Sequence, residues 1–221
     1  MEEQPSQNGA CSMGSPLYHI ALAIISVTAL GRVVGILILK VRQSRYAKKA
    51  VALPSSWKDR CTSPEPYLLG AVTLWLILTH HSPSEPSASA LVQVSAGFFI
   101  ALVAAVLMLW SLKEFPSVST GHYVLPDQQV VSHGPYALVR HPLYLAAFLV
   151  WLSLSIGFSS IAAFVITVVY VIPAYVVYLR AEEEMLLQNL GDAYAEYRQE
   201  VGMLFPRRGR SRASGSGDAS S

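Results

Sequence analysis

Two stretches in the second half of the chain hold most of the side chains that could do chemistry. In the first, residues 130–144, Gly134 and Pro135 predict a turn, and Pro142 suits the first turn of a helix, where its missing N–H needs no partner. Amides at such a helix start, with the positive end of the helix dipole, favour an anion such as a carboxylate. The alternative is a set of interfacial anchors and an aromatic belt. The side chains concerned are Tyr136, Arg140, His141 and Tyr144.

The second stretch, residues 180–197, is acidic and extends an apolar run. Tyr178 and Glu182 lie one helical turn apart, and Leu186 and Leu190 extend the same stripe. A carboxylate just outside the hydrocarbon can accept hydrogen bonds from a sugar diol or pair with a cation. The alternative is a solvated acidic face formed by Glu182, Glu183 and Glu184.

The elements that must position these residues are membrane helices. The chain is 52% hydrophobic and only 14% charged, and its mean hydropathy is positive, which is typical of membrane proteins. A spanning helix needs about 20 mostly apolar residues. Apolar runs occupy residues 17–39, 67–79, 90–112 and 143–179. The last run is too long for one helix, and Gly157, Ser159 and Ser160 predict a turn within it. We therefore expect an all-α, polytopic bundle of five spans.

The distribution of positive charge predicts the orientation of these spans. Apart from Arg32, the lysines and arginines lie within or at the borders of residues 40–60, residues 113–140 and the C-terminal tail. With five crossings these three segments share one side, and the other side has no Lys or Arg. By the positive-inside rule the three segments are cytosolic and the N-terminus is outside. Anionic lipid explains the basic residues of 40–60 better than nucleic acid does.

The organisation expected from this pattern has four parts. Residues 1–16 are an extracytosolic segment, 17–112 the N-terminal spans, 113–206 a catalytic core with a helical hairpin, and 207–221 a disordered basic, Ser/Gly-rich tail. The first span is expected to be retained, because acidic residues replace the basic n-region of a signal peptide. Cys11 and Cys61 fall on opposite sides, so no disulfide between them is expected.

In their order along the chain, the motifs of the two stretches resemble the isoprenylcysteine carboxyl methyltransferase and phospholipid methyltransferase superfamily. The resemblance covers residues 130–206 and is specific as an ordered set, whereas the N-terminal spans match only in being apolar. The shared elements are Gly134-Pro135-Tyr136, Arg140-His141-Pro142-Leu143-Tyr144, a helical hairpin, Glu182-Glu183, Gly191-Asp192-Ala193-Tyr194, Tyr197 and Phe205-Pro206.

The resemblance implies a membrane enzyme that transfers a methyl group from S-adenosylmethionine at a cytosolic pocket. Arg140, His141 and Glu182 are then the catalytic residues. The implied cofactor-binding residues are Gln128, Gln129, Val130, Val131, Tyr136, His141, Pro142, Leu143, Tyr144 and Glu182. No metal is expected, because the histidines, His19, His80 and His81 among them, lack ligand spacing.

The acceptor implied by the resemblance is lipid-like. Candidates are the carboxylate of a prenylated cysteine, a phospholipid amine, or a small hydrophobic thiol or acid. Prenylcysteine methyltransferases carry a substrate arginine four residues before the cofactor-binding acid, but Tyr178 stands there in this chain. Arg180 is about 200° around the helix from Tyr178, at roughly 100° per residue. Tyr178 and Arg180 are the candidate substrate residues.

Two other functions are compatible with the sequence. One is a sterol-reductase-like membrane enzyme, which would need a basic cluster for a nicotinamide phosphate. The other is a small transporter or scaffold, for which Arg32 is the one charged residue within a span. The membrane is expected to be that of the endoplasmic reticulum in a eukaryote or the inner membrane in a bacterium.

Overall fold

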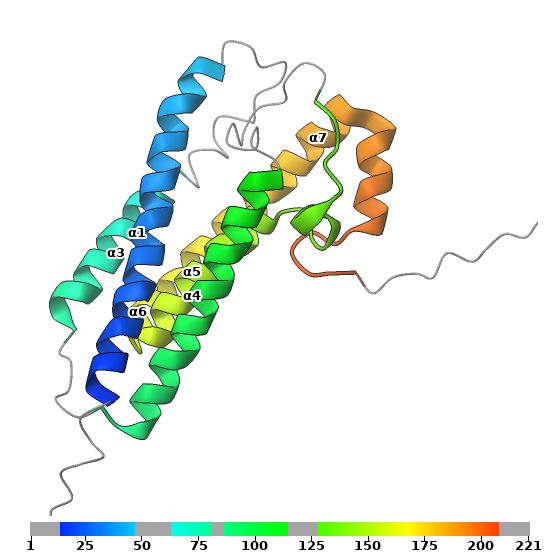
Figure 1. Ribbon diagram of the computed structural model, residues 1–221. Helices are drawn as coiled ribbons and strands as arrows, with labels where there is room; N and C mark the ends of the chain where they lie inside the picture. The colour runs from blue at the N-terminus through cyan, green and yellow to red at the C-terminus, as the bar shows by residue number, and fades with distance from the viewer. Residues whose placement is uncertain (1–13, 47–62, 81–85, 115–127, 208–221) are drawn as a thin grey trace, which may run out of the picture.

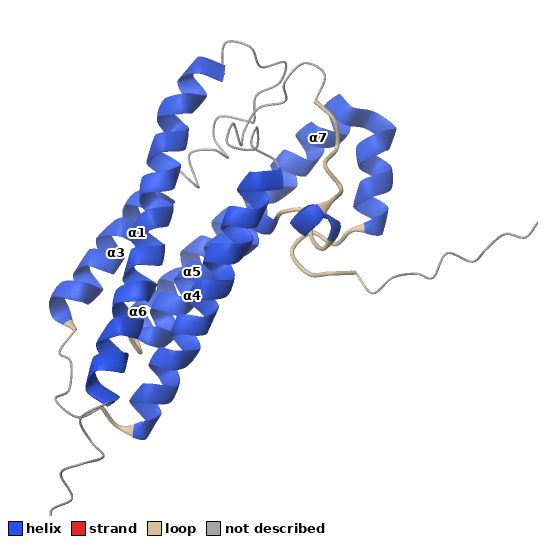
Figure 2. Cartoon of the chain, in the orientation of Figure 1, coloured by secondary structure: helices blue, strands red, loops and turns tan. Residues whose placement is uncertain are grey.

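The computed structural model describes residues 14–46, 63–80, 86–114 and 128–207, and its regular structure is helical apart from one isolated bridge (Figures 1 and 2). The predicted all-α membrane bundle is therefore confirmed. The α-helices are α1 (Gly14–Tyr46), α3 (Glu65–Thr79), α4 (Ala88–Glu114), α5 (Pro142–Gly157), α6 (Ile161–Ile166) and α7 (Ile172–Glu200). A 3-10 helix, η3 (Gly134–Ala137), precedes α5, and a π-helix, η4 (Thr167–Val171), joins α6 to α7.

The five predicted apolar spans correspond to these helices. Three helical stretches are long and apolar enough to cross a membrane, Pro16–Ile38, Ala88–Glu114 and Ile161–Glu200. Two shorter apolar helices, Glu65–Thr79 and Pro142–Gly157, lie among them. At 1.5 Å per residue α3 extends about 22 Å, less than the roughly 30 Å of a hydrocarbon core.

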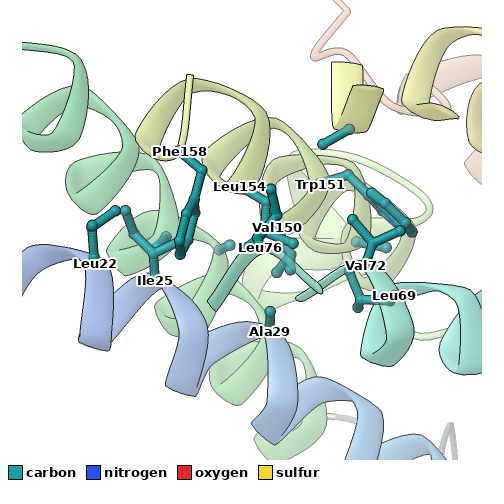
Figure 3. Close-up of a cluster of buried hydrophobic side chains, with 14 of the residues drawn as sticks. Leu22, Ile25, Ala29, Leu69, Val72, Leu76, Val150, Trp151, Leu154 and Phe158 are labelled. Carbon is teal, nitrogen blue, oxygen red and sulfur yellow. The ribbon is translucent and has the colours of Figure 1, made fainter. Parts of the chain in front are cut away.

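The bundle is held together by one apolar face of each helix (Figure 3). In α1 the buried residues Leu22, Ile25 and Ala29 recur at helical spacing, and α3 and α5 present matching stripes. The opposite faces expose large apolar side chains such as Val27, Leu78 and Phe99. Apolar surface of this extent is expected where lipid, rather than water, surrounds a helix. The buried set includes Leu69, Val72, Leu76, Val94, Ala101, Val150, Trp151, Leu154 and Phe158.

Small residues let α4 and α5 approach closely near the end of α5. A Cβ atom on Gly97 would lie 2.7 Å from the Cα of Gly157, and a Cβ on Gly157 would lie 2.5 Å from Cδ1 of Ile25. Glycines at both positions therefore allow α1, α4 and α5 to meet at one level. Small residues commonly serve this purpose between membrane helices.

The predicted turn between the last two spans is confirmed. α5 ends at Gly157, Ser159 adopts a positive φ of 49°, and Ser160 caps α6 by accepting a hydrogen bond from the amide of Ala163. The π-helical turn follows, just before Pro173 near the start of α7. Because proline has no N–H, it interrupts the regular helical hydrogen bonds at this point.

The last helix is not the continuous extension that the sequence suggests. Gly191 has φ 56° and ψ −135°, which breaks the helical path inside α7. In Figure 1 the orange end of the chain turns back at this point and runs down beside η3. The kink brings the residues after Gly191 towards the start of α5 instead of away from the bundle.

Several predictions concern residues outside the described ranges. They are the pairing state of Cys11 and Cys61, part of the basic segment 40–60, His81, and the tail from residue 208 onwards. The four-part domain division likewise stays a prediction.

Candidate functional site

The turn ahead of α5 follows from its glycine and proline. Gly134 has a φ of 60°, and the 3-10 turn from Gly134 to Ala137 buries Pro135 and Tyr136. The hydroxyl of Tyr197, beyond the kink in α7, donates a 2.7 Å hydrogen bond to the carbonyl oxygen of Tyr136. The folded-back end of α7 is thereby attached to the motif that precedes α5.

The segment after α7 binds the backbone just before α5. Val139 and Gly202 form a parallel bridge, the amide of Arg140 donates to the carbonyl of Gly202 (2.8 Å), and the amide of His141 donates to Met203 (3.1 Å). The amides of Arg140 and His141, just before α5, therefore already donate to the chain's own carbonyl groups. The predicted binding of an anion concerns the amides of the first turn of α5 and stays a prediction.

Arg140 is buried and joins three parts of the site. Its Nε and Nη2 lie 2.7 and 2.6 Å from Oε1 of Glu183. Its Nη1 donates to the carbonyls of Arg198 and Val201 at the end of α7. Burial acts to raise the pKa of Glu183, but hydrogen bonds from His141 and Arg140 outweigh it and hold that pKa below its ordinary value. Glu183 is therefore an ionised anchor for the turn.

His141 lies between the two neighbouring glutamates. Its Nε2 is 3.3 Å from Oε1 of Glu183, and its Nδ1 is 3.9 Å from Oε2 of Glu182. Since Glu183 is ionised and can only accept, Nε2 of His141 carries a hydrogen and donates the hydrogen bond to Oε1 of Glu183. The Nδ1 atom is the ring nitrogen turned towards Glu182.

Glu182 differs sharply from its neighbour. Burial raises the pKa of its carboxyl group, and His141 and a hydrogen bond from Tyr144 offset this only in part. Its Oε2 makes no hydrogen bond to any described residue, nor does the buried hydroxyl of Tyr194. Buried polar atoms are nearly always hydrogen-bonded, so a pair of exceptions in one place points to a missing partner.

Aromatic rings complete this cluster. The ring of Tyr144 meets the ring of His141 edge-on, with centroids 5.8 Å apart, and lies 6.0 Å from the ring of Tyr178. Burial raises the pKa values of Tyr136 and Tyr194, and the charge of Glu182 adds to both shifts. Both hydroxyls therefore lie within electrostatic range of that carboxylate and stay protonated.

The structure brings some predicted site residues together and separates others. Tyr136, Arg140, His141, Tyr144, Tyr178 and Glu182 gather between η3, the start of α5 and α7. Gln128, Val130 and Val131 are half-buried in the segment leading to η3, Gln129 is exposed, and Pro142 and Leu143 form the first turn of α5. The side chain of Arg180 is exposed. Its predicted substrate role gains no support from burial.

Three residues of the site had no assigned role in the sequence argument. Glu183 is the main partner of Arg140, Tyr194 contributes a buried hydroxyl, and Gly202 receives the backbone of the turn. In the sequence, these residues stand within the shared motifs or close to them. That position does not indicate which residue each of them contacts. Within the described ranges, no group of three or more His, Cys, Asp and Glu side chains is placed to hold a metal ion.

Comparison with known proteins matches the same region. A family model described as phospholipid methyltransferase matches residues 90–193. A methanethiol S-methyltransferase from a Pseudomonas species is 32% identical over 78 residues, which is 35% of this chain and 28% of that protein. A protein-S-isoprenylcysteine O-methyltransferase from Tribolium castaneum is 33% identical over 84 residues, 36% of this chain and 28% of that protein.

These matches confirm the resemblance that the motifs predicted. The family match extends from α4 through the hairpin to the kink in α7 and leaves out α1 and α3. The chain spans 28% of the length of each of these two curated relatives.

Proposed function

We propose that the chain is an integral membrane methyltransferase that binds S-adenosylmethionine at the cluster formed by the start of α5 and the middle of α7. The observation that carries the proposal is that two buried polar atoms, Oε2 of Glu182 and the hydroxyl of Tyr194, make no hydrogen bond to the described part of the chain. Both come from motifs that the chain shares with methyltransferases, and both lie inside or at the edge of the matched region.

The donor set fits this cofactor. An ionised Glu182 offers an acceptor for the two hydroxyls of a ribose, and Tyr194 offers a hydroxyl that donates or accepts. Arg140 and Arg198 both pair with Glu183. An ionised Glu182 has no arginine partner among the described residues, and its charge favours a ligand that carries a positive sulfonium and ammonium group. Nδ1 of His141 is the atom of the motif available to a ligand, since Nε2 serves Glu183.

Methyl transfer requires little acid–base catalysis by the protein. When bound, S-adenosylmethionine supplies an activated methyl group whose displacement releases a neutral thioether. The residues of this chain have to hold two reactants in line and keep water away, which supplies roughly 7 to 11 kcal/mol in favourable cases. Arg140 and Glu183 fix the turn, Glu182 and His141 orient the donor, and Tyr136 and Tyr144 surround it.

We propose a hydrophobic acceptor that carries its nucleophile at one end and reaches the site from the bilayer. The two similar proteins are named for a thiol and for a prenylated cysteine. Tyr178, at the position of the substrate arginine of prenylcysteine methyltransferases, is buried and uncharged, which favours a small hydrophobic thiol over an acceptor that presents a carboxylate, whether a prenylcysteine or a small acid. A phospholipid amine is the third class to include in the test.

The test is methyl transfer from radiolabelled S-adenosylmethionine into lipid extracts and added acceptors, in membranes that contain the chain. We expect label in a hydrophobic product, and a loss of at least about 100-fold for Glu182→Gln and for His141→Ala. Glu184→Gln, which alters the exposed glutamate of the same triplet, should retain activity. No transfer by wild type to any of the three acceptor classes, together with binding of a nicotinamide nucleotide, would favour the reductase function instead.

A further inference from the structure

A buried polar network lies within the membrane-spanning part of the bundle. Nη1 of Arg32 in α1 donates to both carboxylate oxygens of Glu65 in α3, at 2.7 and 3.0 Å. Nη2 of Arg32 donates to the hydroxyl of Tyr175 in α7 (2.8 Å), and the indole N–H of Trp151 in α5 donates to Glu65 (2.8 Å). We refer to these four residues as the intramembrane network.

The network sits where charges are expensive. Arg32 and Glu65 are 7% and 2% exposed, and Arg32 lies within the apolar stretch Pro16–Ile38, nearer to its C-terminal end. α3 begins at Glu65, so this short helix starts beside Arg32 and is covered there by the other helices. A buried ion pair holds helices together no better than apolar residues of similar size. Cohesion alone therefore does not account for the charges.

Aromatic contacts connect the network to the candidate site. The ring of Tyr175 meets the ring of Tyr144 edge-on, with centroids 5.3 Å apart and planes at 78°. Tyr144 in turn contacts the ring of His141 and donates a hydrogen bond to Glu182. The hydroxyl of Tyr175 faces Arg32, while its ring faces the site. The orientation of the Tyr175 side chain therefore depends both on its hydrogen bond with Arg32 and on its ring contact with Tyr144.

We propose that the intramembrane network is a positioning device for the site. Arg32 fixes the hydroxyl of Tyr175, the ring of Tyr175 sets the position of Tyr144, and Tyr144 aligns His141 and Glu182. Glu65 and Trp151 keep the guanidinium of Arg32 in place. The helices α1 and α3, outside the family match, thereby act on a site built from α5 and α7. The inference rests on the proposed function only for the identity of the ligand used in its test.

The first test compares two ways of releasing Tyr175. Tyr175→Phe removes only the hydroxyl, and Arg32→Met with Glu65→Leu replaces the ion pair by apolar residues. Each should weaken S-adenosylmethionine binding in detergent by about tenfold, which corresponds to about 1.4 kcal/mol. Because both changes break the same path, the three substitutions together should weaken binding no further than either change does.

The matched control is Tyr18→Phe. Tyr18 is also a buried tyrosine of this bundle, and its hydroxyl forms a 3.0 Å hydrogen bond with Nε2 of His80 at the opposite end. This variant should lose thermal stability to a similar extent but bind S-adenosylmethionine as wild type does. If Tyr175→Phe behaves in the same way, the network is purely structural and the proposal is overturned.

A readout without ligand separates this proposal from the proposed function. In protein labelled only at histidine, Tyr175→Phe should shift the imidazole resonance of His141, assigned through His141→Asn, whereas Tyr18→Phe should leave it in place. If wild type does not bind S-adenosylmethionine, the proposed function fails, and the resonance alone decides the positioning role. An unchanged His141 resonance in Tyr175→Phe overturns that role even when wild type binds the cofactor.

Discussion

Glu182 and Glu183 are chain neighbours, but their environments separate their chemistry. Glu183 accepts hydrogen bonds from Arg140 and His141, and its pKa is lowered. Glu182, about 100° further back around the helix, is half-buried, its buried oxygen Oε2 lacks a hydrogen bond to the described residues, and its pKa is raised. Paired titratable groups pushed in opposite directions commonly mark functional sites. At this scale, one glutamate stabilises the turn, and we propose that the other binds the ligand.

The raised pKa of Glu182 predicts how binding depends on pH. A raised folded-state pKa means that ionising Glu182 costs folding free energy, and that the cost disappears as pH falls through this pKa. Binding needs the ionised form as a hydrogen-bond acceptor. We therefore expect the advantage of wild type over Glu182→Gln in S-adenosylmethionine affinity to shrink on acidification, beginning above the ordinary glutamate pKa of 4.5.

Titration calorimetry of both proteins from about pH 8 to about pH 5 measures this ratio. His141, Glu183, Tyr136 and Tyr194 surround the carboxylate in both proteins, so the ratio isolates Glu182. A ratio that does not change with pH would contradict the assigned role. Glu182→Gln should also raise the unfolding midpoint of the ligand-free protein at neutral pH, because it removes a buried charge.

The sequence predicted the residues of this site better than their partners. Glu182 and His141 were expected to share one site, and they approach within 3.9 Å. Which of two adjacent glutamates faces Arg140 depends on the rotation of α7, which no local pattern determines. Glu65 was not singled out, because it stands between Pro64 and Pro66 and resembles a polar helix start. Its depth in the bundle depends on packing against Arg32.

At the scale of elements, the kink in α7 places the end of that helix against the turn that precedes α5. Gly191 folds the end of the helix back, so that Tyr197 reaches Tyr136 and Tyr194 lies within electrostatic range of Glu182 and Glu183. The spans and the turn after Gly157 could be predicted from apolar runs and breakers. The kink could not, because a single glycine is tolerated inside a helix and its φ and ψ are decided by what the folded-back segment contacts.

Replacing Gly191 by alanine tests the kink. With φ 56° and ψ −135°, a Cβ atom there should cost about 1 to 3 kcal/mol of backbone strain, although no other atom lies within 4 Å of it. Gly31→Ala is the matched control, since Gly31 also has open space around it but lies in a regular helix. Thermal unfolding in detergent should show a loss for Gly191→Ala and no loss for Gly31→Ala. Equal midpoints would show that the kink is not strained.

At the scale of the whole molecule, two ion pairs connect parts that are distant in the chain. Arg32–Glu65 joins α1 to α3, and Arg140–Glu183 joins the start of α5 to α7. The C-terminal segment closes the arrangement by binding Arg140 and His141 through Gly202 and Met203. Contacts between residues so far apart in the chain form only in the packed bundle. The spans and motifs could be predicted because they are local patterns in the sequence, whereas these contacts could not.

The most direct test of the central claim is the affinity of the purified, detergent-solubilised chain for S-adenosylmethionine, measured by calorimetry for wild type, Glu182→Gln and Glu184→Gln. We expect wild type and Glu184→Gln to bind equally, and Glu182→Gln to bind at least about tenfold more weakly, the loss expected when a buried acceptor no longer matches its donors. Equal binding by all three proteins, each folded by thermal unfolding, would contradict the placement of the cofactor between α5 and α7.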